Sequence, residues 1–284
     1  MRIALVSMTV LDQDDFDEVP LARALEARGF ESVRVGWDDP RVDWSGFDAA
    51  LLRSTWDYHH RRDEFLLWAR RAAAETRLFN PPDLIEWNSH KFYLRELEHA
   101  GIAIVPTVFL ERGSAADLPA ILEHEGWDAA VIKPAVSADS FATERAERLS
   151  PEAGQRHLDQ HLAERDMLVQ VYMPAVVEPG ERCLVAIDGE VSHAVRKRSK
   201  FLGGRHAGPE GVPVPVEADE GSAAENILKR IGHPPLYARI DLIRDGDGVP
   251  RLMELELVEP SLFFAARPGA AEALVEALAS RLLF

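Results

Sequence analysis

Three acidic side chains near the end of the chain are spaced so that neighbouring strands could present them to one metal ion. Asp241 lies in one apolar run and Glu254 and Glu256 lie in the next, with the sequence Asp245–Gly248 between them. An Asp-Gly turn of this kind is typical of a β-hairpin. If the loop has two residues, Asp241 faces Leu252, and the alternation of side chains places Asp241, Glu254 and Glu256 on one face.

Carboxylates this close repel one another unless a cation lies between them, and hard oxygen ligands suit Mg²⁺ bound together with nucleotide phosphates. We favour a magnesium–nucleotide site, because Asp241 is in phase with the two glutamates across the turn. Two other interpretations stay open. One is an exposed acidic strand face, and the other is a calcium-binding loop at Asp245 and Asp247.

Two lysines are placed where they could meet an anion. Lys133 ends the apolar run that begins at Ala129, so a buried strand would deliver its ammonium group from a fixed position. The segment 135–143 that follows is small and polar, as a loop over phosphate would be, but it contains no glycine. Lys91 lies at the start of an expected helix, where its charge opposes the helix dipole. The alternative for both lysines is an ordinary strand-edge or solvated position.

Composition limits the class of protein. The 284 residues carry a net charge of -16, are 46% hydrophobic and include one cysteine. This charge argues against a nucleic-acid partner, and the length allows two or three subdomains. Neither a secretion signal nor a membrane span is visible, so we expect a cytoplasmic protein with no membrane partner. Cys183 cannot form an intrachain disulfide, and its apolar neighbours predict a buried strand residue.

One segment departs from the acidic background. Residues 191–209 contain no acidic side chain, and five basic residues fall within them: Arg196, Lys197, Arg198, Lys200 and Arg205. Such a concentration of positive charge suits an anionic small molecule. The alternative is a solvated basic loop.

The hydrophobic patterns predict an α/β fold whose first part is a doubly wound parallel sheet, with α+β character in the C-terminal half. The expected strands of the first half are 2–8, 32–35, 49–53, 107–110, 129–133 and 167–172, and the expected helices are 19–28, 61–75, 89–100, 115–123 and 151–163. Antiparallel structure is expected afterwards, with a hairpin of 182–187 and 191–198, helices 219–231 and 270–282, and the acidic hairpin between these helices. Asn80–Pro82 breaks the pattern and marks a boundary, and the expected subdomains are 1–88, 89–173 and 174–284.

In this order, the residues resemble the ATP-grasp superfamily, specifically its glutathione synthetase-like ligases. The resemblance implies ATP and Mg²⁺ as cofactors, with Lys91 and Lys133 on the phosphates and Asp241, Glu254 and Glu256 on the metal. It also implies that the adenine lies against Gln170, Val171, Tyr172 and Met173, and the ribose against Glu181. The chain departs from the usual pattern at Glu256, where many relatives have asparagine, and in the loop after Lys133, which lacks the expected glycines.

Three stretches carry a narrower resemblance, to ligases related to the O-ureido-D-serine cyclo-ligase of D-cycloserine biosynthesis: residues 1–9, 52–59 and 253–263. Ser54, Thr55 and Asp57 follow an expected parallel strand, where ligands of such sheets commonly bind. They are therefore candidates to hold the polar groups of an amino-acid-like substrate. The alternative is that these side chains cap the next helix.

The activity implied by the resemblance is ADP-forming ligation of a carboxylate to an amine through an acyl phosphate. Arg182, Arg196 and Arg205 are the candidate donors to the oxyanion of the tetrahedral intermediate, because a guanidinium stays protonated and donates forked hydrogen bonds. Two alternatives from other classes are a small-molecule kinase and a non-catalytic ATP-binding scaffold. The substrate, the choice between cyclisation and intermolecular ligation, and the oligomeric state, with a homo-oligomer among the options, stay open.

Overall fold

The computed structural model describes residues 1–11, 14–138, 140–197 and 211–283. Its contacts divide the chain into two compact units, which we call unit 1 (Met1–Ser89 with Ala175–Phe284) and unit 2 (His90–Pro174). The N-terminal and C-terminal segments, which the sequence analysis treats as separate subdomains, therefore pack together in unit 1.

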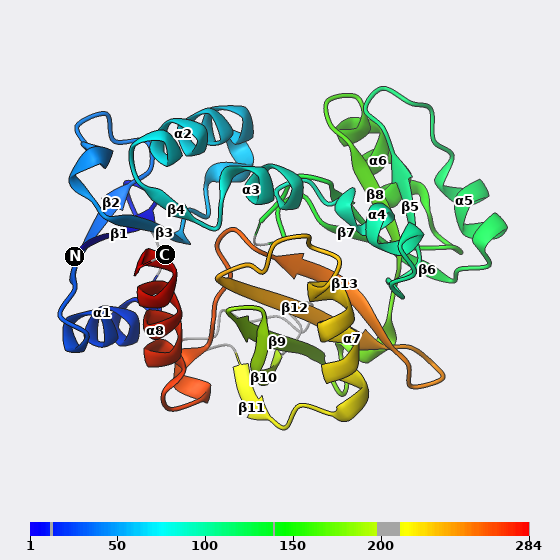
Figure 1. The fold of residues 1–284 in the computed structure, drawn as a ribbon. Helices are drawn as coiled ribbons and strands as arrows, with labels where there is room; N and C mark the ends of the chain where they lie inside the picture. Colours follow the sequence, from blue (N-terminus) through cyan, green and yellow to red (C-terminus); the bar gives the residue numbers. More distant parts are fainter. Residues whose placement is uncertain (12–13, 139, 198–210, 284) are drawn as a thin grey trace. The chain divides into compact units, whose positions relative to one another are not determined.

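The N-terminal part of unit 1 is the expected doubly wound sheet (Figure 1). Its strands are parallel, in the order β2-β1-β3-β4. The elements are β1 (Arg2–Ser7), α1 (Glu18–Ala27), β2 (Glu31–Gly36), β3 (Ala49–Ser54), α2 (Arg62–Glu75) and β4 (Arg77–Phe79). Apolar side chains from the two faces of the strands enter two separate cores. The winding reverses between β1 and β3, which is where sheets of this type bind ligands.

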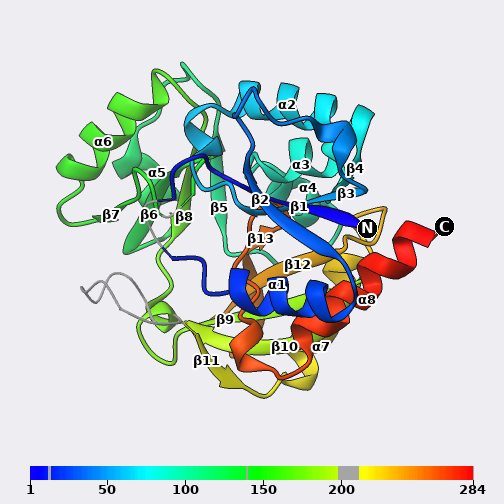
Figure 2. The ribbon, with the colours of Figure 1, turned by 90° about the vertical axis from the view of Figure 1, so that its left-hand side faces the viewer.

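The C-terminal part of unit 1 is an antiparallel sheet in the order β11-β10-β9-β12-β13. Its elements are β9 (Glu181–Ile187), β10 (Glu190–Lys197), β11 (Gly211–Val214), α7 (Ala218–Leu228), β12 (Tyr237–Arg244), β13 (Pro250–Glu256) and α8 (Ala270–Leu283). Helices α1 and α8 come from opposite ends of the chain and lie side by side, with Arg28 Nε 2.9 Å from Glu276 Oε1 (Figure 2). Both helices pack on a core that includes residues of β1, β3, β9 and β12.

Unit 2 is a four-stranded sheet in the order β5-β8-β6-β7 with its own apolar core. Its elements are α4 (Tyr93–His99), β5 (Thr107–Leu110), α5 (Leu118–Glu125), β6 (Ala129–Pro134), β7 (Glu144–Glu147), α6 (Glu152–Leu162) and β8 (Met167–Val171). Residues of α5 and α6 share this core with one face of the strands, and Phe92 and Arg95 pack on Phe109 of the opposite face.

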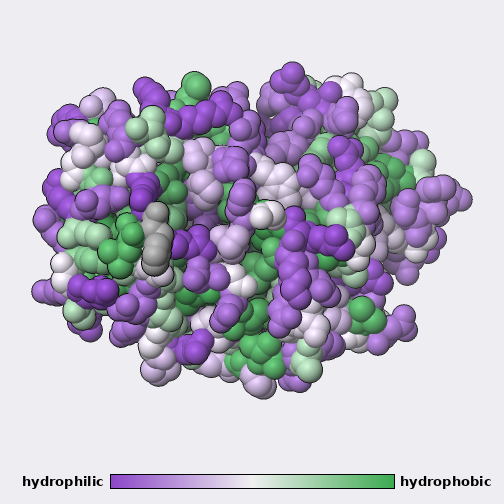
Figure 3. Space-filling view, viewed as in Figure 1, coloured by the Kyte–Doolittle hydropathy of each residue, from purple (hydrophilic) through white to green (hydrophobic). Residues whose placement is uncertain are grey.

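Hydrophilic residues cover much of the face seen in Figure 3, with apolar residues in small patches, as the high charge content predicts. None of the helices in the described part of the chain is both long and apolar enough to span a bilayer.

Asn80–Pro82 does not separate the two units: the chain leaves unit 1 after Ser89 and returns to it after Pro174, each within one residue of the expected subdomain limits. Pro82 begins a helix, α3 (Pro82–Asn88), because proline is well suited to the first helical turn. Asn80 is fully buried inside unit 1. The helix expected over 89–100 is also shorter, starting at Tyr93, and the short strands β4 and β7 were not expected because three or four residues show no clear period.

The acidic hairpin forms, but its expected register was wrong in two details, whose combined effect leaves the side chains on the expected face. The loop is one residue longer, since Asp245 N–H donates to Val249 O, and a bulge follows in which Asp241 pairs with Glu254 while Leu242 pairs with Leu252. Each irregularity shifts the pairing by one residue. Together they shift it by two, which keeps the same side chains on the same face.

Candidate active site

The expected carboxylates lie on one face of β12 and β13. Asp241 is the direct cross-strand partner of Glu254, and Arg239 is the partner of Glu256, so the four side chains share a face. Asp241 and Arg239 are almost fully buried. The same face of β9 and β10 carries Cys183 and Val195, which belong to the core beneath α8. The acidic residues therefore lie beside a dry core, and burial strengthens every charge interaction among them.

Arg239 is the counter-charge of this cluster. Its Nε donates to Asp241 Oδ1 at 2.8 Å, its Nη2 donates to Oδ2 at 2.8 Å, and Nη2 also donates to Glu256. Burial raises the pKa of Asp241, but Arg239 outweighs this effect and holds the pKa below its usual value. Burial raises the pKa of Glu256 to about 7; the charges of Asp241 and Glu254 add to this shift, and Arg239 opposes it.

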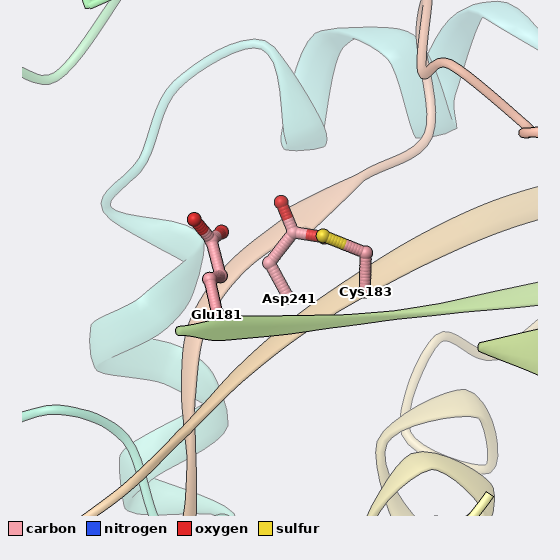
Figure 4. A group of neighbouring side chains, drawn as sticks. All are labelled: Glu181, Cys183 and Asp241. Atoms are coloured by element: carbon pink, nitrogen blue, oxygen red, sulfur yellow. The ribbon is translucent and has the colours of Figure 1, made fainter. Parts of the chain in front are cut away.

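Glu181 and Cys183 of β9 complete this face (Figure 4). Their side chains project on the same side as Asp241, and one ligand atom from each of the three residues lies within 4.8 Å of the others. Burial, followed by the charge of Asp241, raises the pKa of Glu181 to about 7. Cys183 is fully buried, as expected, and burial raises its thiol pKa, so it stays protonated rather than acting as a nucleophile.

The cluster has the charge that a divalent cation requires. The four carboxylates Glu181, Asp241, Glu254 and Glu256 face two cationic side chains, Arg239 and Lys197, the latter being the cross-strand partner of Glu181. Among the described residues, the fully ionised face therefore has an excess of two negative charges. The raised pKa values of Glu181 and Glu256 reflect burial and this repulsion. Oxygen donors with unbalanced negative charge fit Mg²⁺.

Arg182 and Arg196, expected to act on the oxyanion, lie on the opposite face of the sheet. Arg182 pairs with Arg196 and with Leu242, whereas Asp241 pairs with Cys183, and successive side chains alternate between faces. There, Arg182 Nε lies 2.7 Å from Glu220 Oε1 of α7. Strand alternation therefore points these two candidate oxyanion donors away from the face that carries Asp241, Glu254 and Glu256.

The arginines on this opposite face help to line a cavity of about 240 Å³ with Glu217 and Glu220. Arg205 and the basic residues Arg198 and Lys200 lie outside the described residues.

In unit 2, three of the residues expected to bind nucleotide share the sheet face away from α5 and α6. Gln170 pairs with Val131 and Lys133 with Leu168, while Ile132, Val169 and Val171 belong to or pack on the core of the other face. Alternation therefore places Lys133, Gln170 and Tyr172 together on the face opposite α5 and α6, where Lys133 and Gln170 are buried. Gln170 Nε2 donates to Thr107 Oγ1 at 3.0 Å, and the Arg145 guanidinium lies 3.8 Å from the Tyr172 ring centre.

The side chain of Val171 packs on the core, so only its backbone is available to a ligand on the sheet face opposite α5 and α6. Met173 follows β8 and is partly buried.

Lys91 lies beside the end of β6. Its N–H donates to Ala135 O at 2.8 Å, and its Nζ donates to Ser137 O at 2.7 Å and to Ser137 Oγ at 3.0 Å. The structure therefore brings Lys91 and Lys133 to the same end of one strand, and each is less than 10% exposed. The expected location of Lys91 at a helix start was wrong, since α4 begins two residues later. The loop it contacts uses positive φ angles at Ser140 and Ala142 in place of glycines.

The residues after β3 differ in how well their polar atoms are paired. Ser54 Oγ donates to Asp15 Oδ2 at 2.6 Å, and Asp57 Oδ1 accepts from Trp37 Nε1 at 2.9 Å. Thr55 is fully buried, and its hydroxyl meets no partner among the described residues. The helix that follows is a 3-10 helix, Tyr58–His60, and its N-cap Asp57 makes no side-chain cap, so the capping alternative was wrong for it. The next α-helix, α2, begins at Arg62, and its N-cap Arg61 makes none either.

Sequence reasoning missed Arg239, Lys197 and Arg53 as site residues. The signal for Arg239 was present, since a residue two positions before Asp241 in a strand shares its face. Lys197 was noted only as part of a basic segment, and its pairing with Glu181 depends on the hairpin register. Nothing local distinguishes Arg53, whose environment is built from distant parts of the chain.

Comparison with known proteins gives consistent matches. A family model described as the N-terminal domain of D-cycloserine synthetase DcsG matches residues 3–80. The cycloserine biosynthesis protein DcsG of Streptomyces lavendulae is 33% identical over 300 residues, which cover 99% of this chain and 98% of that protein. The crystal structure of D-cycloserine synthetase DcsG matches with a TM-score of 0.88 at 32% identity, over 99% of this chain and all of that one.

More distant structures share the fold. A RimK domain ATP-grasp protein from Sphaerobacter thermophilus matches over the full length of both chains with a TM-score of 0.71 at 21% identity. A D-alanine–D-alanine ligase from Bacillus anthracis, solved with ATP, matches with a TM-score of 0.69 at 15% identity, over 100% of this chain and 97% of that one. At these identities the likeness concerns the fold alone, which is the ATP-grasp fold expected from the sequence.

Proposed function

Because the chain belongs to the D-cycloserine synthetase (DcsG) family of ATP-grasp ligases, we propose that it uses Mg-ATP to activate the carboxylate of an amino-acid-like substrate and closes a ring onto a nitrogen of the same molecule. It is an enzyme that forms a C–N bond. The first candidate substrate is O-ureido-D-serine, the substrate of the ligases that the sequence resembles. The observation that carries the proposal is the acidic face of β12 and β13, with its excess of two negative charges.

The roles of the acidic residues follow from their chemistry. Asp241, Glu254 and Glu256 would hold Mg²⁺, which when bound supplies positive charge to the nucleotide phosphates. Glu181 lies beside Asp241, so it is placed to contribute to the same cation as well as to the ribose. Arg239 replaces Arg182 and Arg196 as the candidate donor to negative charge on the reacting carboxylate, because it lies among the carboxylates and stays protonated.

The residues of unit 2 would bind ATP. Lys91 and Lys133, held at one end of β6, would offset phosphate charge during attack by the substrate carboxylate. The adenine would lie against the side chains of Gln170 and Tyr172, on the sheet face opposite α5 and α6, and against the backbone of Val171 and Met173. Attack gives an acyl phosphate and ADP, and the substrate nitrogen then displaces phosphate. Exclusion of water would protect the acyl phosphate from hydrolysis.

The test is ADP release by Glu254→Gln with Mg-ATP and O-ureido-D-serine. We expect a loss of roughly a hundredfold or more, the scale of removing a group that organises charge at a reacting centre. Asp247→Asn is the matched control, because this exposed turn residue also removes one carboxylate from the same hairpin. It should keep the wild-type rate. An unaffected rate in Glu254→Gln would remove the metal assignment, and a loss in Asp247→Asn alone would favour the calcium-loop interpretation.

Hydroxylamine trapping tests the chemistry itself. An acyl phosphate gives a hydroxamate, which mass spectrometry of the products detects, and the uninhibited reaction should give the cyclised amide. A stable phosphorylated product without hydroxamate would instead identify a kinase.

A further inference from the structure

Arg53 and Thr55 present buried donors that the protein does not use. Arg53 is 4% exposed and Thr55 is fully buried. Within the described ranges, Nε and Nη1 of Arg53 and Oγ1 of Thr55 have no hydrogen-bond partner. An unpaired buried donor is costly, and native structures contain few of them. Two such residues, separated by a single position, indicate that something other than the described residues satisfies them.

The contacts that Arg53 does make hold its guanidinium in place. Its Nη2 donates to Pro260 O at 3.1 Å and lies 3.7 Å from Asp17 Oδ2. Asp17 in turn accepts the N–H groups of Leu262, Phe263 and Phe264, so it is anchored and cannot move to meet the remaining donors. The Tyr237 ring, with its centre 5.6 Å from the guanidinium carbon, supports the same group. The unused donors are therefore rigidly positioned.

Their place in the fold is one where ligands bind. Arg53 and Thr55 lie at the carboxyl end of β3, next to the end of β1, which is the point where the sheet reverses its winding. Pairing between β3 and β1 is irregular at Arg53, and its guanidinium lies over the ring of Tyr237, which belongs to the core that includes Leu262 and Phe263. The end of this face is bordered by residues of β3, of the chain before α1, and of the segment that follows β13.

We propose that Arg53 and Thr55 form a subsite for an oxygen acceptor of the amino-acid-like substrate. The inference rests on the proposed function and adds the group that is recognised and the residues that recognise it. The Nε and Nη1 groups of Arg53 can only donate and repel an ammonium group, so they require an acceptor, and the Thr55 hydroxyl can donate to the same acceptor. Since Asp17 already balances the charge of Arg53, an uncharged carbonyl oxygen leaves no excess charge in this buried place, whereas a carboxylate leaves one. The acceptor of the subsite is therefore a carbonyl remote from the reacting carboxylate.

The first experiment uses Thr55→Val, which removes the hydroxyl and keeps the shape of the side chain. The KM for the amino-acid substrate should rise roughly tenfold, the value of one buried hydrogen bond, with an unchanged KM for ATP. Its melting temperature should be equal to or above that of the wild type, because no protein contact is lost. Thr76→Val is the matched control: Thr76 is also buried, but its hydroxyl donates to Phe47 O at 2.8 Å. This control should melt earlier and keep its KM.

Arg53→Lys is the second variant, since it keeps the charge beside Asp17 but loses the forked donors. The KM for the amino acid should rise by about a hundredfold, as hydrogen bonds from a charged group are stronger. Two inhibitors then identify the acceptor: one substrate analogue without the remote carbonyl, and one with the carboxylate reduced to an alcohol. Thr55→Val should weaken binding of the alcohol but leave binding of the analogue without the carbonyl unchanged.

The reverse pattern would overturn the assignment to the carbonyl. Unchanged KM values in both variants of an active enzyme would overturn the subsite while leaving the proposed function intact. A wild-type protein that binds the amino acid but releases no ADP with it would overturn the proposed function alone, and calorimetric binding to the variants would then still test the subsite.

Discussion

Arg239 is the residue on which the charge balance of the acidic face centres. It neutralises Asp241 and Glu256 from a buried position, and Glu181 and Lys197, which also act on it by charge, oppose each other. A buried carboxylate without a counter-charge is strongly destabilising, more so than the net value of the ion pair itself suggests. Without a bound cation, the stability of the acidic face therefore depends largely on this guanidinium, with Lys197 as the second cation among the described residues.

We expect Arg239→Met to lower the free energy of unfolding by about 3–5 kcal/mol, the usual cost of removing one partner of a buried pair. Urea unfolding at pH 7, followed by circular dichroism, measures it. Arg41→Met is the control, because Arg41 is 86% exposed and pairs only with Asp39, so its loss should change little. A change below about 1 kcal/mol in Arg239→Met would contradict this account.

Arg182 separates a structural role from a catalytic one. It joins β9 to Glu220, which is 1% exposed and is also bound by Arg244 at 3.0 Å. Arg182→Met should therefore cost about 1–3 kcal/mol of stability, since Arg244 still compensates Glu220 in part. Steady-state kinetics at a temperature where the variant is folded should give the wild-type kcat. A fall in kcat with unchanged stability would return Arg182 to the reaction.

At the scale of elements, two buried asparagines tie the α3 segment to the acidic hairpin. Asn80 Nδ2 donates to Tyr237 O and Leu257 O, and its Oδ1 accepts from Leu236 N–H. Asn88 bridges Leu255 O and Leu257 N–H in the same way. These amides satisfy backbone groups at the ends of β12 and β13 that no neighbouring strand reaches, so they fix where the carboxylates lie.

Asn80→Ala should lower the free energy of unfolding by about 2–4 kcal/mol, because it leaves three buried backbone groups unpaired. Asn226→Ala, at an exposed position of α7, is the matched control and should stay within about 0.5 kcal/mol of the wild type. Chemical denaturation of the full chain measures both. Equal stability of the two variants would show that the amide of Asn80 contributes little.

The whole molecule consists of two units with separate cores, and unit 2 is inserted between the two segments of unit 1. Separate cores allow separate opening, because each core is formed by residues of its own unit. Local stability should therefore differ between the units, and a core substitution should act mainly on its own unit.

Leu158→Ala tests this independence. Leu158 is fully buried in the core of unit 2, and the loss should cost about 2–5 kcal/mol. Hydrogen exchange of the full chain, read by mass spectrometry, should show faster exchange in peptides from residues 90–174 and little change elsewhere. Equal acceleration in both units would mean that they unfold as one.

Much of the fold could be predicted because its signals are local. Alternation and apolar periodicity located β1, α1, β3, α2, β6 and both hairpins, and turn residues marked the hairpin loops. The acidic face was predicted for the same reason, since two register errors of one residue each still leave Asp241 in phase with Glu254. Asn80–Pro82 does not separate the two units, because Pro82 starts a helix as readily as it ends one.

Local sequence was therefore enough to identify the charged residues, their strands and their relation to neighbours on the same strand. The order of strands in each sheet, however, comes from pairing between distant segments. That order turned Arg182 away from the carboxylates, placed Glu181 next to Asp241, and buried Arg53 beside Pro260. Burial and pairing depend on what packs from elsewhere in the chain, so the pKa values and the unused donors of Arg53 and Thr55 became visible only in the folded molecule.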